Sequence, residues 1–234
     1  MELHFGKFQL ISTLYTPFAV DTPGGTQVVA KPSMEYLGSA IHSSGLADNE
    51  VSKRIAIARA DFDALDRTWT HSALTWKQKL QIYSSLVESK FLYSMVSLVL
   101  TIAQQRRVNG FQNRCLRRII GVLPAYVSRV SNATVLQRSS YILATRLLHK
   151  RRLQQFGKIL RSPEGHPLRT ATFIPNTMIP TTERYVRRIG RPCKEWTREV
   201  IPEITSLFGS LEAARTVAMQ KELWNNALFD KLGF

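Results

Sequence analysis

The sequence has few cysteines, no long hydrophobic run and, over one extended stretch, no acidic residue. Its two cysteines, Cys115 and Cys193, cannot supply a disulfide framework, which favours a reducing, intracellular compartment over secretion. The first ten residues lack the layout of a secretory signal peptide. The most apolar run, residues 91–103, is interrupted by serine and threonine and is too short to cross a bilayer. It therefore predicts a buried helix.

Residues for catalysis or metal binding are also scarce. The sequence has no strand-borne Asp-Asp pair that would hold two metal ions, and no glycine-rich phosphate loop. Asp61, Asp63 and Asp66 fall within an amphipathic helical pattern, where solvent-facing charge is expected. Cys115 falls on an apolar stripe, which predicts an inert buried thiol, and neither cysteine has a histidine at zinc-binding spacing. The sequence thus predicts no catalytic residue, no metal site and no cofactor.

Positive charge is abundant. Lys and Arg number 32 against 17 Asp and Glu, giving a formal net charge of +15. Such a surplus attracts polyanions; nucleic acid is the first candidate, because each neutralised phosphate releases counterions. An anionic membrane surface is the second, less favoured candidate.

This charge is concentrated between Glu88 and Glu164, where the sequence has neither Asp nor Glu. Helices exposed to solvent usually mix the two signs, because opposite charges four residues apart support the helix. A partner that supplies negative charge would explain the imbalance, and a merely solubilising basic surface is the alternative. The predicted nucleic-acid-binding residues are Arg106, Arg107, Arg114, Arg117, Arg118, Arg146, Lys150, Arg151, Arg152, Lys158 and Arg161.

Hydrophobic periodicity predicts a mainly helical chain with a small β segment at the N-terminus. Strands and turns are expected over residues 1–45, and a bundle of helices over 46–161, with single helices near 48–69, 75–100, 103–120 and 142–160. On the third of these helices, Arg107, Arg114 and Arg118 share a face away from the apolar stripe. Several prolines predict a linker or arm over 162–192, and two amphipathic helices are expected over 193–234.

An ordered set of short strings resembles the non-LTR (LINE-like) retrotransposon reverse transcriptases. The most specific is residues 111–121, Phe-Gln-Asn-Arg-Cys-Leu-Arg-Arg-Ile-Ile-Gly. The others are Leu3-His4-Phe5-Gly6-Lys7, Glu35-Tyr36-Leu37-Gly38, Trp76-Lys77-x-Lys79-Leu80, Arg151-Arg152-Leu153-x-x-x-Gly157 and Gly190-Arg191-Pro192-x-x-x-Trp196. Their order matches the end of the polymerase palm, the thumb and a C-terminal region.

The resemblance implies a fold and a set of roles. It implies a palm-edge β segment over 1–45 followed by a thumb-like helical bundle. Tyr36, Leu37 and Gly38 would support the primer end, although a simple hairpin packed under the first helix is an equal alternative. The catalytic Asp pair of the family, which holds Mg, would lie upstream of residue 1, as would the fingers. The chain by itself is therefore not expected to be an enzyme.

These expectations combine into one function and two alternatives. The chain is expected to bind the backbone of an RNA or DNA duplex, such as a primer–template, as part of an RNA-directed DNA polymerase. Missing upstream polymerase domains are a further expected partner, and the nucleus or a cytoplasmic ribonucleoprotein is the expected location. The first alternative is a truncated retroelement fragment without function. The second is a basic protein that binds a membrane or an acidic partner.

Overall fold

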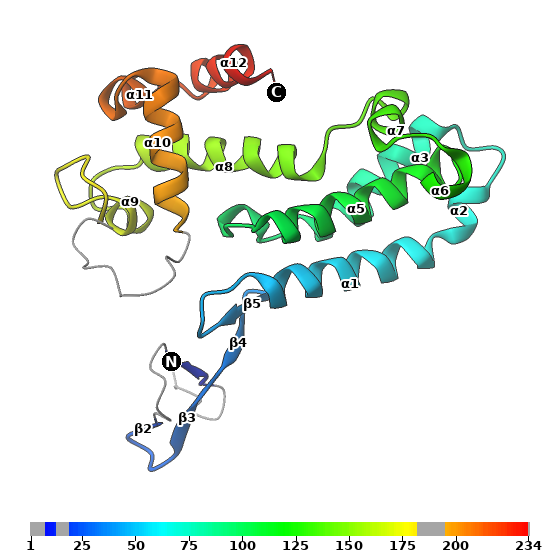
Figure 1. Ribbon diagram of the computed structural model, residues 1–234. Coiled ribbons are helices and arrows are strands. Elements are labelled where there is room, and N and C mark those ends of the chain that lie inside the picture. The colour runs from blue at the N-terminus through cyan, green and yellow to red at the C-terminus, as the bar shows by residue number, and fades with distance from the viewer. Residues whose placement is uncertain (1–7, 13–18, 182–194, 234) are drawn as a thin grey trace. The chain divides into compact units, whose positions relative to one another are not determined.

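The computed structural model describes residues 8–12, 19–181 and 195–233 (Figure 1). The chain divides into two compact units, residues 1–95 with 100–141, and residues 96–99 with 142–234. A small N-terminal sheet precedes helices, so the expected fold class is confirmed. Among the described residues, no helix is both long and apolar enough to cross a membrane.

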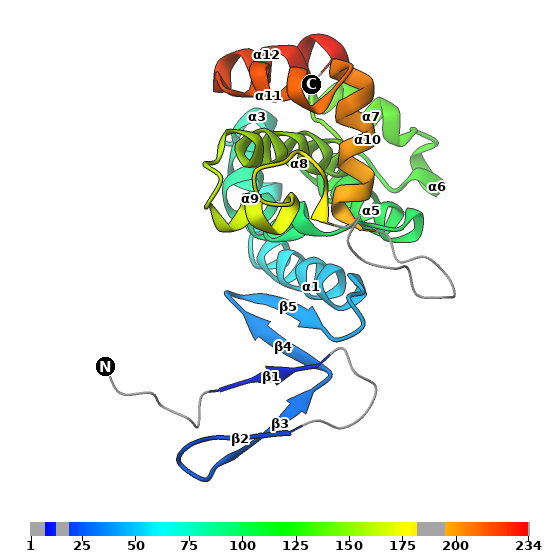
Figure 2. The ribbon, with the colours of Figure 1, turned by 90° about the vertical axis from the view of Figure 1, so that its left-hand side faces the viewer.

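The β segment consists of one small sheet and one hairpin. Strands β1 (Leu10–Ile11), β3 (Gln27–Lys31) and β2 (Ala19–Asp21) form the sheet in that order. A turn at residues 22–26 joins β2 to β3, as its Thr-Pro-Gly-Gly sequence predicts. The hairpin pairs β4 (Ser33–Tyr36) with β5 (Ser39–His42) in antiparallel register. The hairpin packs against α1 (Asp48–Ala64), as Figure 2 shows.

Several helices of the first unit begin or end at residues that commonly cap helices. Thr75 and Thr101 each form a capping box, at the starts of α3 (Trp76–Ile82) and α5 (Ile102–Ile119). Gly121, with a φ of 71°, follows the end of α5, where only a left-handed residue reverses the chain easily. The remaining helices are α2 (Asp66–Thr70), a π-helical segment (Tyr83–Glu88), α4 (Ser89–Phe91), a short 3₁₀ helix (Met95–Ser97), α6 (Ala125–Ser128) and α7 (Asn132–Ser139).

The expected second helix, 75–100, is shorter than its pattern predicted. It ends after Phe91, and Ser94 has a φ of 61°, which no helix residue adopts. The reason is visible in the packing, because the Ser94 hydroxyl donates a hydrogen bond to the buried Glu50 carboxylate. A tertiary contact thus overrides an apolar run that would continue a helix on its own.

Helices α1 and α5 pack against each other and, with α3 and the π-helical segment, enclose the core of the first unit (Figure 1). Aromatic side chains fill it: Phe62 stacks on Trp69, and Phe91 contacts Phe111. Cys115 is buried on the inner face of α5, as its apolar stripe predicted. An adjacent strip of α5 remains exposed and carries arginines.

The second unit is built on α8 (Ala144–Arg161), with α10 (Trp196–Phe208), α11 (Leu211–Ala218) and α12 (Lys221–Leu232) packed around it (Figure 2). The expected bundle over 46–161 therefore ends near residue 141, because α8 shares its core with the C-terminal helices. The expected linker over 162–192 is also partly structured. Its first part forms α9 (Pro167–Thr172), and Phe173 is buried beside Phe156.

Candidate nucleic-acid interface

Helix α5 presents a row of arginines on its solvent-facing side. Arg107, Arg114 and Arg118 are exposed and are spaced by seven and four residues, so they share one face, as predicted. Val108, Phe111 and Cys115 form the neighbouring stripe of the helix and are buried. The face forms because apolar residues at helical spacing fix which side of α5 meets α1.

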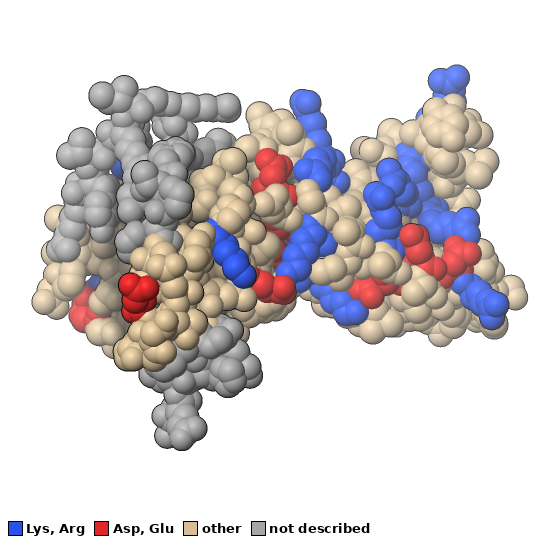
Figure 3. Space-filling model, turned by 90° about the horizontal axis from the view of Figure 1, so that it is seen from below, with Lys and Arg blue, Asp and Glu red and all other residues tan. Residues whose placement is uncertain are grey.

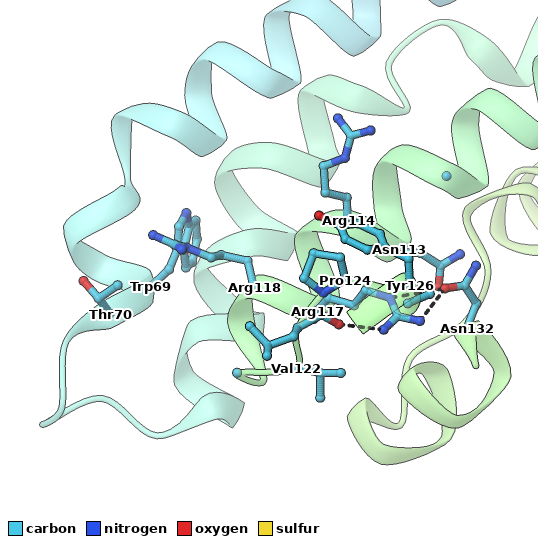
Figure 4. Close-up of a pocket in the computed structure, with 14 residues that line it drawn as sticks. Trp69, Thr70, Asn113, Arg114, Arg117, Arg118, Val122, Pro124, Tyr126 and Asn132 are labelled. Atoms are coloured by element: carbon cyan, nitrogen blue, oxygen red, sulfur yellow. Dashed lines mark hydrogen bonds between the residues drawn. The ribbon is translucent and has the colours of Figure 1, made fainter. Parts of the chain in front are cut away.

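Two adjoining cavities lie along this face. The smaller, about 310 Å³, lies between α1 and α5, and its walls are Ile55, Arg59, Arg107, Gly110, Phe111 and Arg114. The larger, about 770 Å³, lies beside the C-terminal half of α5 and the turn that follows it (Figure 4). Gly110 and Arg114 line both cavities. The basic face is therefore a grooved surface and not a flat one.

The positive charge of this face is partly offset, which the sequence did not predict. Asp66 pairs with Arg118 at 2.6 Å, and Asp48 lies 3.5 Å from Arg107. On α4, Lys90 pairs with Asp61, which was expected to be solvent-facing charge. Figure 3 shows the two signs interspersed on the face that it displays. Carboxylates of α1 and of the start of α2 thus supply part of the negative charge that the acid-free stretch itself lacks.

Arg114 and Arg106 differ from these paired arginines. Both are exposed, and neither forms a hydrogen bond or an ion pair with any residue that the structure describes. Arg114 lies in the groove, whereas Arg106 lines neither of the two cavities. Arg59 lines the groove as well, is exposed and likewise has no such partner among the described residues, so Arg59 and Arg114 are the groove cations most available to an anionic ligand.

Arg117 has a structural role instead of the expected phosphate contact. Its side chain is buried, and its guanidinium donates to the carbonyl oxygens of Leu123 and Val130 and to the side chain of Asn132 (Figure 4). These bonds tie the turn after α5 to the start of α7. Because its donors are used by the chain, Arg117 is removed from the predicted binding set.

Basic residues of the second unit also serve the fold. Arg146 donates to the carbonyl oxygens of Leu232 and Gly233 at the end of α12, and Arg161 donates to that of Ala218 at the end of α11. A cation there satisfies carbonyls that lack a helical partner and opposes the negative end of the helix dipole. Arg146 and Arg161 thus stabilise helix ends, and because Arg146 is exposed, its predicted contact with phosphate stays a prediction.

Arg152 is likewise engaged by the chain. It donates to the Leu98 carbonyl oxygen at 2.7 Å and lies 3.4 Å from Glu199. Burial lowers the pKa of Arg152, and the Glu199 carboxylate opposes that change. Of the other predicted residues of this helix, Lys150 and Arg151 are half-buried and Lys158 is exposed. The sequence therefore overestimated the basic surface of α8.

The turn of the β4–β5 hairpin is held rigidly while its side chains face solvent. Leu37 and Gly38 have φ values of 48° and 77°, the pattern of a type I′ turn. The Tyr93 hydroxyl donates to the Leu37 carbonyl oxygen at 2.8 Å, and Arg54 and Lys53 both donate to that of Gly38. The hairpin packed on α1 is thus present. The exposed side chains of Tyr36 and Leu37 are compatible with primer-end support, which stays a prediction.

A buried carboxylate anchors this hairpin. Glu50, on α1, accepts hydrogen bonds from the Ala40 amide, the Arg54 guanidinium and the Ser94 hydroxyl. Burial raises the pKa of Glu50, but the hydrogen bonds from Ser94, Ala40 and Arg54 outweigh it and lower the pKa below its usual value. The ionised carboxylate is therefore part of what positions the turn.

Sequence reasoning missed several residues of the groove. Arg59 lies outside the acid-free stretch, on α1, and reaches the groove only because α1 packs beside α5. Trp69 and Tyr126 line the larger cavity, and no local pattern links them to α5. One feature of the sequence could have pointed to the groove. Gly110 lies inside a predicted helix, where glycine is unfavourable, so its presence suggests that space is needed at that position.

No part of the described chain holds three or more His, Cys, Asp or Glu side chains at a spacing suited to a metal ion. Burial raises the pKa of the Cys115 thiol to about 12, which agrees with an unreactive core residue. The strings at residues 3–7 and 190–192, and Cys193, lie outside the described residues. No family model, curated protein or solved structure matches the chain.

Proposed function

We propose that the α5 face of the first unit binds the sugar–phosphate backbone of an RNA or DNA duplex, as the thumb of a retrotransposon reverse transcriptase does. One observation carries the proposal: arginines from two helices, Arg59 on α1 and Arg107, Arg114 and Arg118 on α5, line adjoining cavities on one face. Arginine forks suit bidentate contact with phosphate, and backbone contacts do not depend on base sequence.

The same proposal assigns no chemistry to this chain alone. The chain holds duplex without acting on it and uses no cofactor. RNA-directed DNA synthesis would need upstream polymerase domains that supply the Mg-binding carboxylates. A nuclear or cytoplasmic ribonucleoprotein location follows from this role. The net charge of +15 supports an anionic polymer as the partner.

The test is a salt titration of binding to an RNA–DNA hybrid by the purified chain. We expect the logarithm of the affinity to fall linearly with the logarithm of salt concentration. Replacing Arg107, Arg114 and Arg118 with Ala should weaken binding to all sequences and flatten the slope by about one for each phosphate that is no longer bound. The matched control replaces Lys31, Arg138 and Lys221, which are exposed and line neither cavity.

Three results would contradict the proposal. An equal effect of the two triple variants would show that only net charge matters. A chain that aggregates when purified would favour the truncated fragment without function. Equal affinity for anionic vesicles and hybrid would favour the basic membrane-binding alternative.

A further inference from the structure

The larger cavity has features that backbone binding alone does not require. Its volume of about 770 Å³ falls within the range of about 300–1,000 Å³ that is usual for ligand sites. Trp69, Val122, Leu123, Pro124 and Tyr126 supply mostly apolar walls, and Arg114 and Arg118 also line it (Figure 4). Phosphate contacts need cations at the surface but no such apolar space.

Tyr126 offers a free aromatic face at this cavity. The residue lies on the short helix α6, its exposed fraction is 79%, and its ring stacks on no other ring in the described chain. Leu123, beside it, is 61% exposed. An aromatic ring next to arginines is the arrangement on which proteins stack the unpaired bases of single-stranded nucleic acid.

Asn113 adds a polar side chain to the lining of the cavity. The residue is buried, with an exposed fraction of 6%, and its amide nitrogen donates to the Asn109 carbonyl oxygen at 2.8 Å. Its side-chain oxygen has no hydrogen-bond partner among the described residues. This oxygen is itself covered by protein atoms, so Asn113 makes the wall polar at this point without offering an open contact to an occupant.

Gly110 indicates that the groove is kept open. It lies in the middle of α5, where alanine would favour the helix, and a Cβ atom built there meets nothing within 4 Å. No contact in the fold therefore requires glycine at this position. Because Gly110 lines both cavities, its missing side chain joins them into one continuous path.

We infer that the larger cavity takes one unpaired base of a nucleic-acid strand, with the neighbouring phosphates on Arg114 and Arg118. The inference rests on the proposed function and narrows its substrate to a duplex with an unpaired segment. A nucleic acid fits better than an acidic peptide with an aromatic anchor. Arg59 and Arg107 extend the cationic groove past Gly110, as a chain of phosphates requires.

The experiment compares two hybrids that differ only in one short unpaired extension, by fluorescence anisotropy at fixed salt. We expect the full chain to prefer the extended hybrid by about tenfold, the usual effect of one stacked base. Tyr126→Ala should abolish the preference while leaving the affinity for the blunt hybrid unchanged. Tyr126 is exposed, so this change does not disturb the core. Tyr126→Phe, which keeps the aromatic face, should retain the preference.

The outcomes separate this inference from the proposed function. Binding of both hybrids without preference, or a preference that survives Tyr126→Ala, overturns the inference alone. If the unmodified chain binds neither hybrid, both the inference and the proposed function are wrong. If Tyr126→Ala weakens binding of an acidic peptide with an aromatic residue and affects neither hybrid, the cavity is a peptide site and the inference is wrong.

Discussion

Arg118 and Asp66 form an ion pair across the junction of α5 and α2, with 2.6 Å between Nη2 and Oδ1 and both side chains half or more exposed. The pair places a carboxylate beside the groove that is proposed to hold phosphates. A ligand must therefore compete with Asp66 for the Arg118 guanidinium. The sequence could not indicate this competition, because 52 residues separate the two partners.

Replacing Asp66 with Asn should strengthen hybrid binding and steepen its salt dependence, because Arg118 then becomes free to contact a phosphate. The free energy of unfolding should change by less than about 1 kcal/mol, since exposed ion pairs contribute little. Asp230→Asn is the matched control, with the same change of net charge on an exposed residue of the other unit. Equal gains in the two variants would show a general charge effect instead.

Glu50 should make the first unit sensitive to acid. Its pKa is lower in the folded chain than in the unfolded chain, so it stabilises the fold above about pH 4.3. That stabilisation is lost as the pH falls through the lower, folded value. Glu50→Gln should reduce the free energy of unfolding at neutral pH by about 1–3 kcal/mol, the usual cost of losing hydrogen bonds to a charge.

The same variant should lose less stability between about pH 5 and pH 3 than the unmodified chain does. Denaturant unfolding over this range checks both effects. Glu35→Gln, which removes an exposed carboxylate from the same hairpin, should change the stability at neutral pH by less than about 1 kcal/mol. An unchanged acid dependence in Glu50→Gln would assign the effect to other carboxylates.

Local pattern explains much of the fold but less of the candidate interface. The caps at Thr75 and Thr101 and the left-handed Gly121 depend on a few neighbouring residues, and the helices expected near 75 and 103 begin within one residue of the predicted positions. The arginine face of α5 also follows, because it needs only helical spacing. The structural role of Arg117 could not be predicted in this way. It depends on hydrogen bonds to Leu123, Val130 and Asn132, which come close to Arg117 only because the chain turns after α5.

The boundary between the two units, near residue 141, also could not be predicted from local sequence pattern. Residues 144–161 have the periodicity of any amphipathic helix, and periodicity does not tell which partner covers the apolar face. The cover comes from α10, α11 and α12, far along the chain. Arg146 and Arg161 donate hydrogen bonds to carbonyl oxygens at the ends of α12 and α11, so part of the positive charge of α8 stabilises the fold.

Gly157 should be essential to the second unit. A Cβ atom at this position would lie 2.6 Å from Cε2 of Trp224, whose indole nitrogen donates to the Leu153 carbonyl oxygen. Gly157→Ala forces this buried ring away and should cost about 1–3 kcal/mol. Gly110→Ala, also inside a helix but in open space, should instead stabilise by about 0.5–1 kcal/mol. Thermal unfolding of both variants tests whether Gly157→Ala lowers the stability and Gly110→Ala raises it.

Leu37 combines backbone strain with exposure, since its φ is 48° and its exposed fraction is 74%. Asn suits this position of a type I′ turn far better than Leu, so Leu37→Asn should stabilise the hairpin by about 1 kcal/mol. If the exposed Leu supports a primer end, the same change should weaken binding to a hybrid with a recessed 3′ end. Binding to a duplex whose ends are closed by loops should not change.

Leu46→Asn controls for the loss of an exposed leucine, because Leu46 is 63% exposed and lies outside the hairpin. If Leu37 supports the primer end, Leu37→Asn should raise the stability of the chain and lower its affinity for the hybrid. If Leu37 serves only the fold, the change should raise the stability without any loss of affinity. A more stable variant that binds both duplexes as before would reduce Leu37 to a strained turn residue. The Tyr93 hydroxyl and Arg54 would then hold the turn for the sake of the fold alone.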